Sequence, residues 1–268
     1  MRVWGFVPSR ETAAKLFVTG ATVGPLVDSL HNQCLLKYNI APISLNIDDA
    51  SLGSAISAGS NDPIFTSSWL IPPLLGVAYV VLGGVLPRLF SFSNISDTNG
   101  PSTKPGSRND LLSNFSMKEK AITAVVSTAI IIRLSEFLQT HTLFEGIGGG
   151  NDKVNAFLNL AVMLIASILQ WLLLDGTFPS LIAASVTSIG GPLAELPFVA
   201  SGCWEYIPTS ADYLPLSSLP DWADSLSRQL LGDGYRGLAL SSITGPCYFA
   251  VTMDAIALGR WFDTNKEE

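Results

Sequence analysis

The sequence has little charge, few histidines and no paired cysteines. Only 14% of its 268 residues are Asp, Glu, Lys or Arg, whereas a soluble domain usually carries about a quarter. The two histidines, His31 and His141, are too few for a histidine-rich metal site. Cys34, Cys203 and Cys247 form no C-x-x-C pair, so their spacing predicts neither a disulfide framework nor a zinc ribbon. The net charge of −7 comes without a basic stripe, which argues against a nucleic-acid partner.

What the chain does have is apolar sequence gathered into long runs. Hydrophobic residues make up 48% of it, and the mean hydropathy is +0.38. A bilayer core about 30 Å thick requires ~20 mostly apolar residues of helix. We therefore predict one all-α membrane domain over residues 1–268, a six-helix transmembrane bundle with helices near 13–36, 65–86, 120–138, 154–174, 178–200 and 238–258.

Glycine and proline interrupt several of these runs. Gly-Pro pairs fall inside three predicted helices, at Gly24-Pro25, Gly191-Pro192 and Gly245-Pro246, and Pro72-Pro73 falls inside a fourth. Proline removes a backbone hydrogen bond and kinks a helix. Gly20 and Gly24 form a G-x-x-x-G face that permits close approach of another helix. Kinked helices with small residues either leave a pocket open to lipid-like molecules or simply pack densely, and the sequence favours neither alternative.

Lysine and arginine are distributed unevenly between the predicted loops. Ten of the 15 fall at the amino end, in the 87–119 loop with its border to the third helix, or in the tail after the sixth: Arg2, Arg10, Lys15, Arg88, Lys104, Arg108, Lys118, Lys120, Arg260 and Lys266. Cytoplasmic loops carry the excess of basic residues in membrane proteins. This bias predicts an even number of helices with both termini in the cytosol.

The segment 91–117 is rich in Ser, Asn, Gly and Pro, which predicts a flexible cytosolic loop. It contains two glycosylation sequons, at Asn94 and Asn114. Because glycosylation acceptors lie in secreted or lumenal loops, the predicted orientation leaves both asparagines unmodified.

The segment 207–237 is the second long loop and is predicted to be lumenal. Ser218 can cap a helix that has Pro220 in its first turn. Trp222, Leu226 and Leu230 then recur every four residues on one face. This predicts a short amphipathic helix, which either lies on the lumenal membrane surface or packs against another loop.

Ionisable residues inside the predicted helices are the candidates for chemistry, because a charge in hydrocarbon is costly. Asp28 and His31 are three residues apart, which places them on one helical face as either a proton-relay pair or a structural hydrogen bond. Arg133 and Glu136 have the same spacing and are interpreted as a structural ion pair. The sequence contains neither G-x-S-x-G nor H-E-x-x-H, and we assign no catalytic or metal-binding residue.

Four segments, in order along the chain, resemble the insulin-induced-gene (Insig) family. SWLIPPLLG at 68–76 is similar to the family's S-x-W-x-P-P-x-x-G segment. WLLLD at 171–175 is similar to W-W-T-F-D, and GCWEY with TSADYL, within 202–214, to G-V-Y-Q-Y-T-S-P-D-F-L. PCYF, TM and GR, within 246–260, match P-C-x-F, T-M and G-R. The chain is thus identified as a divergent member of this family.

The resemblance implies a multi-pass endoplasmic-reticulum protein with cytosolic ends that is not an enzyme and requires no cofactor. Members of the family bind oxysterols in a membrane cavity and retain sterol-sensing-domain partners, namely Scap and HMG-CoA reductase. These properties are therefore expected here: sterol binding, and a regulatory part in cholesterol and lipid metabolism.

The resemblance also implies roles for individual residues. The family's partner-binding aspartate falls on Asp175, which sits at a helix carboxyl end that disfavours an anion. The family's basic D-R-S-R segment is here Asp175-Gly176-Thr177-Phe178, so no neighbouring cation explains the carboxylate and we expect an outside contact. The ligand-binding residues expected from the matching segments, with Asn159 beside the position of the family's sterol-contacting glutamine, are Trp171, Asn159, Trp69, Trp204 and Tyr206.

A second hypothesis comes from another functional class. Asp28, Glu195 and Asp254 lie in three different predicted helices and can form a polar path. The alternative function is therefore a small lipid or ion transporter, or a channel, of an organelle membrane.

Overall fold

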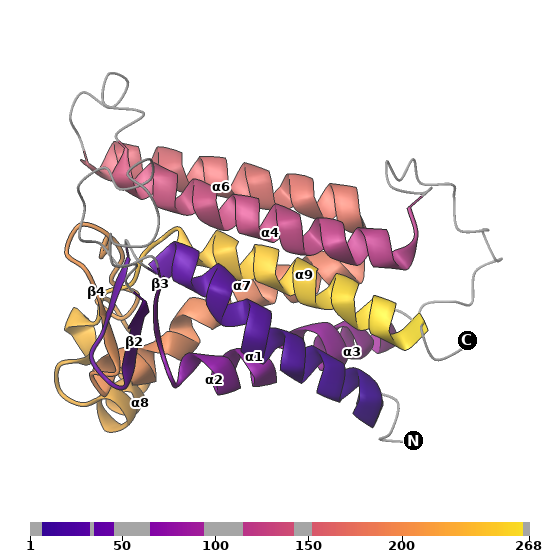
Figure 1. Cartoon of the computed structure of the whole chain (residues 1–268). Helices are drawn as coiled ribbons and strands as arrows, with labels where there is room; N and C mark the ends of the chain where they lie inside the picture. Colours follow the sequence, from indigo (N-terminus) through magenta and orange to yellow (C-terminus); the bar gives the residue numbers. More distant parts are fainter. Residues whose placement is uncertain (1–6, 33–34, 46–64, 94–114, 142–151, 265–268) are drawn as a thin grey trace.

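The computed structural model describes residues 7–32, 35–45, 65–93, 115–141 and 152–264. Long helices run side by side and reverse direction from one to the next (Figure 1). They are α1 (Arg10–Asn32), α2 (Ile71–Tyr79) continued by a π-helical turn η2 (Val80–Val85) and α3 (Leu86–Ser93), α4 (Met117–Thr140), α6 (Asp152–Leu174), α7 (Phe178–Ala200) and α9 (Thr244–Thr264). We call the end of the bundle where α1 begins and α9 ends the terminal end.

The predicted all-α membrane bundle is confirmed, but the number of spans is smaller than six by length and composition. Among the described residues, four helical stretches are long and apolar enough to cross a membrane: Ile71–Phe90, Met117–Thr140, Lys153–Leu174 and Phe178–Ala200. The helices α1 and α9 run alongside them (Figure 1). Their polar side chains, including Asp28 and Asp254, lower their hydropathy below that of the other four.

Four short strands, absent from the sequence predictions, lie at the opposite end, which we call the strand end (Figure 1). β1 (Leu36–Tyr38) pairs antiparallel with β4 (Trp204–Tyr206), and β2 (Pro42–Leu45) with β3 (Phe65–Ser68). The predicted helices at 13–36 and 65–86 were therefore placed wrongly at this end. Their outermost residues pair with distant segments, and tertiary pairing of this kind is not visible in a local apolar pattern.

Two of the four pairs that contain proline lie at the start of a helix and not in its interior. Pro72-Pro73 lies in the first turn of α2, and Gly245-Pro246 lies in the first turn of α9. Proline is tolerated there because the backbone N–H groups of the first turn have no partner within the helix. Pro25 in α1, together with Pro192 and Pro197 in α7, does lie inside a helix. Of the four predicted interruptions, those at Gly24-Pro25 and Gly191-Pro192 therefore lie in helix interiors.

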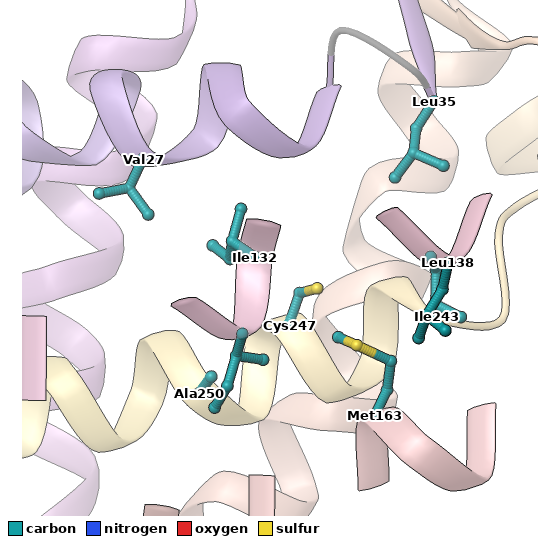
Figure 2. Packing of buried hydrophobic residues seen from close by; sticks show 9 residues of the cluster. Val27, Leu35, Ile132, Leu138, Met163, Ile243, Cys247 and Ala250 are labelled. Atoms are coloured by element: carbon teal, nitrogen blue, oxygen red, sulfur yellow. The ribbon is translucent and has the colours of Figure 1, made fainter. Parts of the chain in front are cut away.

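The helix α9 lies at the centre of the bundle and contacts α1, η2, α4, α6 and α7. Figure 2 shows one of its core clusters, in which side chains from α1, α4, α6 and the start of α9 meet. Its members include Val27, Ile132, Met163, Cys247 and Ala250. Burial of such side chains is the main source of packing free energy between elements, so α9 joins passes that are otherwise far apart in the sequence.

Glycines permit the closest helix contacts. A Cβ atom built on Gly20 would lie 2.5 Å from the Leu75 carbonyl oxygen, so the predicted small-residue face of α1 packs directly on α2. On η2, a Cβ atom on Gly83 would meet the Ala255 carbonyl of α9 at less than 3.0 Å, and Gly259 faces Gly83 in the same way. Backbones can approach so closely only where side chains are absent.

A short helix, α8 (Asp221–Leu231), lies at the strand end within segment 207–237. Its N-cap residue is Pro220, which makes no side-chain cap hydrogen bond. The expected cap by Ser218 is therefore wrong. Trp222, Leu226 and Leu230 are 75%, 50% and 70% exposed. The described residues therefore do not cover this apolar stripe. Of the segment 91–117, residues 94–114 lie outside the described part of the chain.

Candidate ligand-binding cavity

A cavity of about 390 Å³ opens between α1, α2, η2, α7 and α9. This volume falls within the range of small-molecule sites, which are mostly apolar with a few convergent polar groups. The α2–η2 side supplies apolar lining, including Leu75, Val81 and Leu82. The polar lining comes from the last turn of α1, from β1 and β4, and from the strand-end halves of α7 and α9. The cavity is therefore amphipathic, with its polar side at the strand end.

Asp28 carries the first polar group of this lining. It lies on one face of α1 with His31 and Asn32, because residues three and four apart on a helix are neighbours. Its Oδ2 accepts hydrogen bonds from Asn32 Nδ2 at 2.7 Å and from the Tyr38 hydroxyl at 3.1 Å. Asp28 and His31 therefore share a face as predicted, but these contacts pair the carboxylate with β1.

His31 makes different contacts. Its Nδ1 lies 2.7 Å from Ser135 Oγ of α4 and 3.8 Å from Cys247 Sγ of α9. The ring is buried and lines the cavity. Through these contacts His31 links α1 to α4 and α9.

Glu195 is the second carboxylate of the lining. The hydroxyls of Tyr206 and Tyr248 donate to its two oxygens at 2.7 and 2.8 Å. A Cβ atom on Gly191 would lie 2.5 Å from the Tyr248 ring, so only glycine lets this ring lie against α7 one turn before Glu195. Hydrogen bonds to a carboxylate are stronger than neutral ones, and this network joins α7 to β4 and α9.

Asp254 of α9 lies outside the lining. Its Oδ2 accepts a hydrogen bond at 2.7 Å from Tyr79, whose ring does line the cavity. Four of the six tyrosines of the chain therefore donate to the three carboxylates that the sequence singled out. The predicted polar path is divided between two separate groups, since Asp28 and Glu195 share the cavity and Asp254 does not line it.

The structure brings only part of the predicted ligand set together. Trp204 lines the cavity. Tyr206 does not line it, but its hydroxyl donates a hydrogen bond to Glu195, which does. Trp69 precedes α2, is 69% exposed and does not line it. Trp171 donates from Nε1 to the Thr177 carbonyl at the terminal end, and Asn159 donates to the Leu138 carbonyl. These last three residues lie apart from this cavity.

Asp175 has an internal partner, contrary to the expectation that no cation explains its carboxylate. Arg260 of α9 forms an ion pair with it through both guanidinium nitrogens, and the Thr177 hydroxyl donates to it at 2.5 Å. The Asp175 side chain is only 6% exposed. The expectation was wrong because Arg260 is 85 residues away in the sequence and no local pattern connects the two.

The contacts of Asp175 act on its pKa in opposite directions. Burial alone would raise the pKa of this carboxyl, but the hydrogen bonds and charge of Arg260, with hydrogen bonds from Ser180 and Thr177, outweigh burial and lower it below 3.8. A depressed folded-state pKa stabilises the fold above the unfolded-state pKa, and this contribution is lost as the pH falls through the folded value.

We therefore expect a pH-dependent difference in thermal unfolding between the natural chain and Asp175→Asn. The variant should unfold at lower temperature, by a constant margin from about pH 7 to about pH 5, and the margin should shrink below about pH 4. Thermal unfolding of the purified protein across this range tests the prediction. A margin that persists undiminished at about pH 3 would show that the ionised carboxylate is not the stabilising form.

Tyr38, Tyr79 and Tyr248 are the site residues that sequence reasoning missed. Tyr38 lies outside every matching segment, and Tyr248 lies inside the PCYF match without having been assigned a role. The signal that could have found them is the presence of carboxylates in apolar helices, because a buried acceptor requires a donor. Which tyrosine serves which carboxylate depends on tertiary packing.

Comparison with protein-family models and with curated sequences finds no match. Two solved structures share the fold. A cross-linked trimeric variant of MvINS aligns over 100% of both chains with a TM-score of 0.57 and 16% identity. The mycobacterial Insig homologue MvINS from Mycobacterium vanbaalenii aligns over 97% of this chain and 95% of its own, with a TM-score of 0.54 and 17% identity. The chain is thus a multi-pass membrane protein with an Insig-like fold.

Proposed function

We propose that this chain is a non-catalytic, sterol-responsive regulator of the endoplasmic-reticulum membrane. It holds an oxysterol or a related amphiphilic lipid in the cavity and retains sterol-sensing-domain membrane proteins, such as Scap-like proteins and HMG-CoA reductase. One observation carries the proposal: an amphipathic cavity of about 390 Å³ inside a bundle with the fold of an Insig homologue.

The chemistry of the cavity supports an amphiphile rather than a wholly polar solute. Its α2–η2 side offers hydrocarbon to an apolar body, and burial of apolar surface contributes about 25 cal/mol per Å². Its strand-end side offers Asp28, Glu195 and Thr244 to a polar group. A lipid with one polar end satisfies both parts, and small-molecule sites commonly combine these features.

The sterol proposal predicts specific photolabelling within the cavity. A photoreactive oxysterol should label the purified protein, and unlabelled oxysterol should compete. Ala194 lines the cavity on α7, so Ala194→Trp should fill part of it and lower labelling at least about fivefold, equivalent to about 1 kcal/mol. Val186→Trp is the matched control, because Val186 is exposed on the same helix and does not line the cavity. Equal suppression by oxysterol and an unrelated lipid would refute a specific site.

The proposed orientation places the terminal end in the cytosol. The described basic residues at that end are Arg10, Lys15, Arg88, Lys118, Lys120 and Arg260. Basic residues are enriched on the cytoplasmic side of membrane proteins. The strand end, with α8, is then lumenal, where the apolar stripe of α8 can rest in the membrane interface.

This orientation predicts that Asn94 and Asn114 carry no glycan in cells, although both are sequons. By contrast, Ser225→Asn creates a sequon with Ser227 at an exposed position of α8 and should be glycosylated. Gel mobility before and after glycosidase treatment measures both. A glycan on the natural sequons, lost in Asn94→Gln or Asn114→Gln, would invert the proposed topology.

Partner retention is supported by the resemblance to the Insig family and by the shared fold. Affinity purification from membranes, with and without added oxysterol, tests it. Sterol-dependent recovery of a sterol-sensing-domain protein is the expected result, and recovery of none under either condition would contradict the regulatory part of the proposal.

A further inference from the structure

The strand-end side of the cavity contains two carboxyl groups, and no lysine or arginine of the described residues lines the cavity beside them. Asp28 and Glu195 line it from α1 and α7. His31 also lines this side, and its Nδ1 lies against the Ser135 hydroxyl and the Cys247 thiol. A carboxylate inside a membrane protein is costly unless it is paired, so the lining leaves a place for a positive charge.

Both carboxylates can accept further hydrogen bonds. Asn32 and Tyr38 donate to the same oxygen of Asp28, Oδ2, and no described residue donates to Oδ1. Each oxygen of Glu195 accepts one tyrosine hydroxyl. Because an ionised carboxylate has about four lone-pair sites, these groups together can receive several donors from a bound molecule.

Aromatic rings surround the same part of the cavity. Tyr38, Phe198, Trp204 and Tyr248 line it. The Trp204 ring stacks on Phe198 at 4.8 Å and meets Tyr38 edge-on at 6.2 Å. The faces of aromatic rings attract cations, and aromatic rings combined with carboxylates are typical of sites for ammonium ligands.

We infer that the cavity binds an amphiphile with a cationic amine head, with its ammonium facing Asp28 and Glu195 and its apolar body along α2 and η2. The inference rests on the proposed function, because it narrows the head-group chemistry of the lipid that the same cavity holds. An ammonium group brings three donors and one positive charge. A hydroxyl brings one donor and no charge, and a sulfate head brings negative charge to two carboxylates.

Competition against the photoreactive oxysterol tests the inference with three sterols that differ only in the head. One carries a hydroxyl, the second a primary amine in the same place, and the third a sulfate. The amine should block labelling at about tenfold lower concentration than the hydroxyl, since charge-assisted hydrogen bonds are about twice as strong as neutral ones. The sulfate should block least.

Charge-removing variants locate the head group. Asp28→Asn and Glu195→Gln keep the shape of each side chain, and each should reduce the amine's advantage over the hydroxyl sterol to less than about threefold. A thermal unfolding transition like that of the natural chain shows that each variant is folded. Glu205→Gln is the matched control, because Glu205 lies on β4 between Trp204 and Tyr206 but is exposed and pairs with Lys37.

Two failures can be told apart. An amine that competes no better than the hydroxyl, or that keeps its advantage in both charge-removing variants, would overturn the amine head and leave the sterol cavity intact. No labelling by the probe, together with no thermal stabilisation by any of the three sterols, would overturn the proposed function and this inference together.

Discussion

Gly83→Ala should destabilise the protein by at least about 3 kcal/mol, because overpacking typically costs 1–3 kcal/mol and more where nothing can yield. The new Cβ atom would lie closer than 3.0 Å to both the carbonyl carbon and the carbonyl oxygen of Ala255. Neither atom can rotate away as a side chain would, so η2 and α9 would have to separate. Thermal unfolding of the purified protein in detergent measures the effect.

Gly190→Ala is the control for this prediction. Gly190 also lies inside a helix, α7, but a Cβ atom there meets nothing within 4 Å. Alanine is favoured over glycine in helix interiors by up to about 1 kcal/mol, so this variant should be as stable as the natural chain or slightly more so. Similar unfolding temperatures for the two variants would show that the η2–α9 contact is looser than described.

Removing Asp175 should destabilise the fold by about 2 kcal/mol, since hydrogen bonds to charged groups contribute about 1.5–3 kcal/mol. Asp175→Ala leaves Arg260 without its carboxylate, and it also removes the carboxylate acceptor of the Thr177 hydroxyl. The ion pair joins the α6–α7 junction to α9 at the terminal end. The unfolding temperature of Asp175→Ala should therefore fall even in the absence of any partner protein.

A charge swap separates this structural role from a role in partner binding. Asp175→Arg combined with Arg260→Asp can restore the ion pair with its direction reversed, and it should recover part of the lost stability. If sterol-sensing-domain partners require the Asp175 carboxylate itself, the swapped protein should be folded but should not co-purify with them.

The exposed ion pair between Arg133 and Glu136 is the control for the swap. Pairs at the surface contribute about 0–1 kcal/mol, so Arg133→Ala should have little effect. Full stability of Asp175→Ala would contradict the structural role, and full partner recovery by the swapped protein would contradict the partner role.

The bundle was predictable because a helix that crosses the hydrocarbon core of a bilayer needs about 20 mostly apolar residues, and such runs are visible in a sequence. The helix at 178–200 was predicted with the bounds that α7 has, and the Arg133–Glu136 pair follows from helical spacing alone. The ends of other helices could not be predicted as well from the sequence. At 36–38 and 65–68 the chain leaves helix to pair with strands that are remote in sequence, and remote pairing overrides local preference.

The candidate site was predictable only in part, and for a related reason. Intramembrane carboxylates stand out in a sequence because they are costly, which identified Asp28, Glu195 and Asp254. The donors that satisfy them come from other elements, as Tyr79 and Tyr248 do. The ion pair of Asp175 was missed in the same way, because its cation is on α9. Sequence reasoning identified the groups that need partners and could not identify the partners.

The central position of α9 has a consequence for biogenesis. This helix is the last long helix of the bundle in chain order, and synthesis proceeds from the amino terminus. Until α9 is inserted, the groups that bind it, such as Tyr79, Thr128 and Ser167, face lipid or water. The bundle is therefore incomplete until α9 has been synthesised and packed. A product truncated before α9 would expose these polar groups, by which membrane quality control can recognise it.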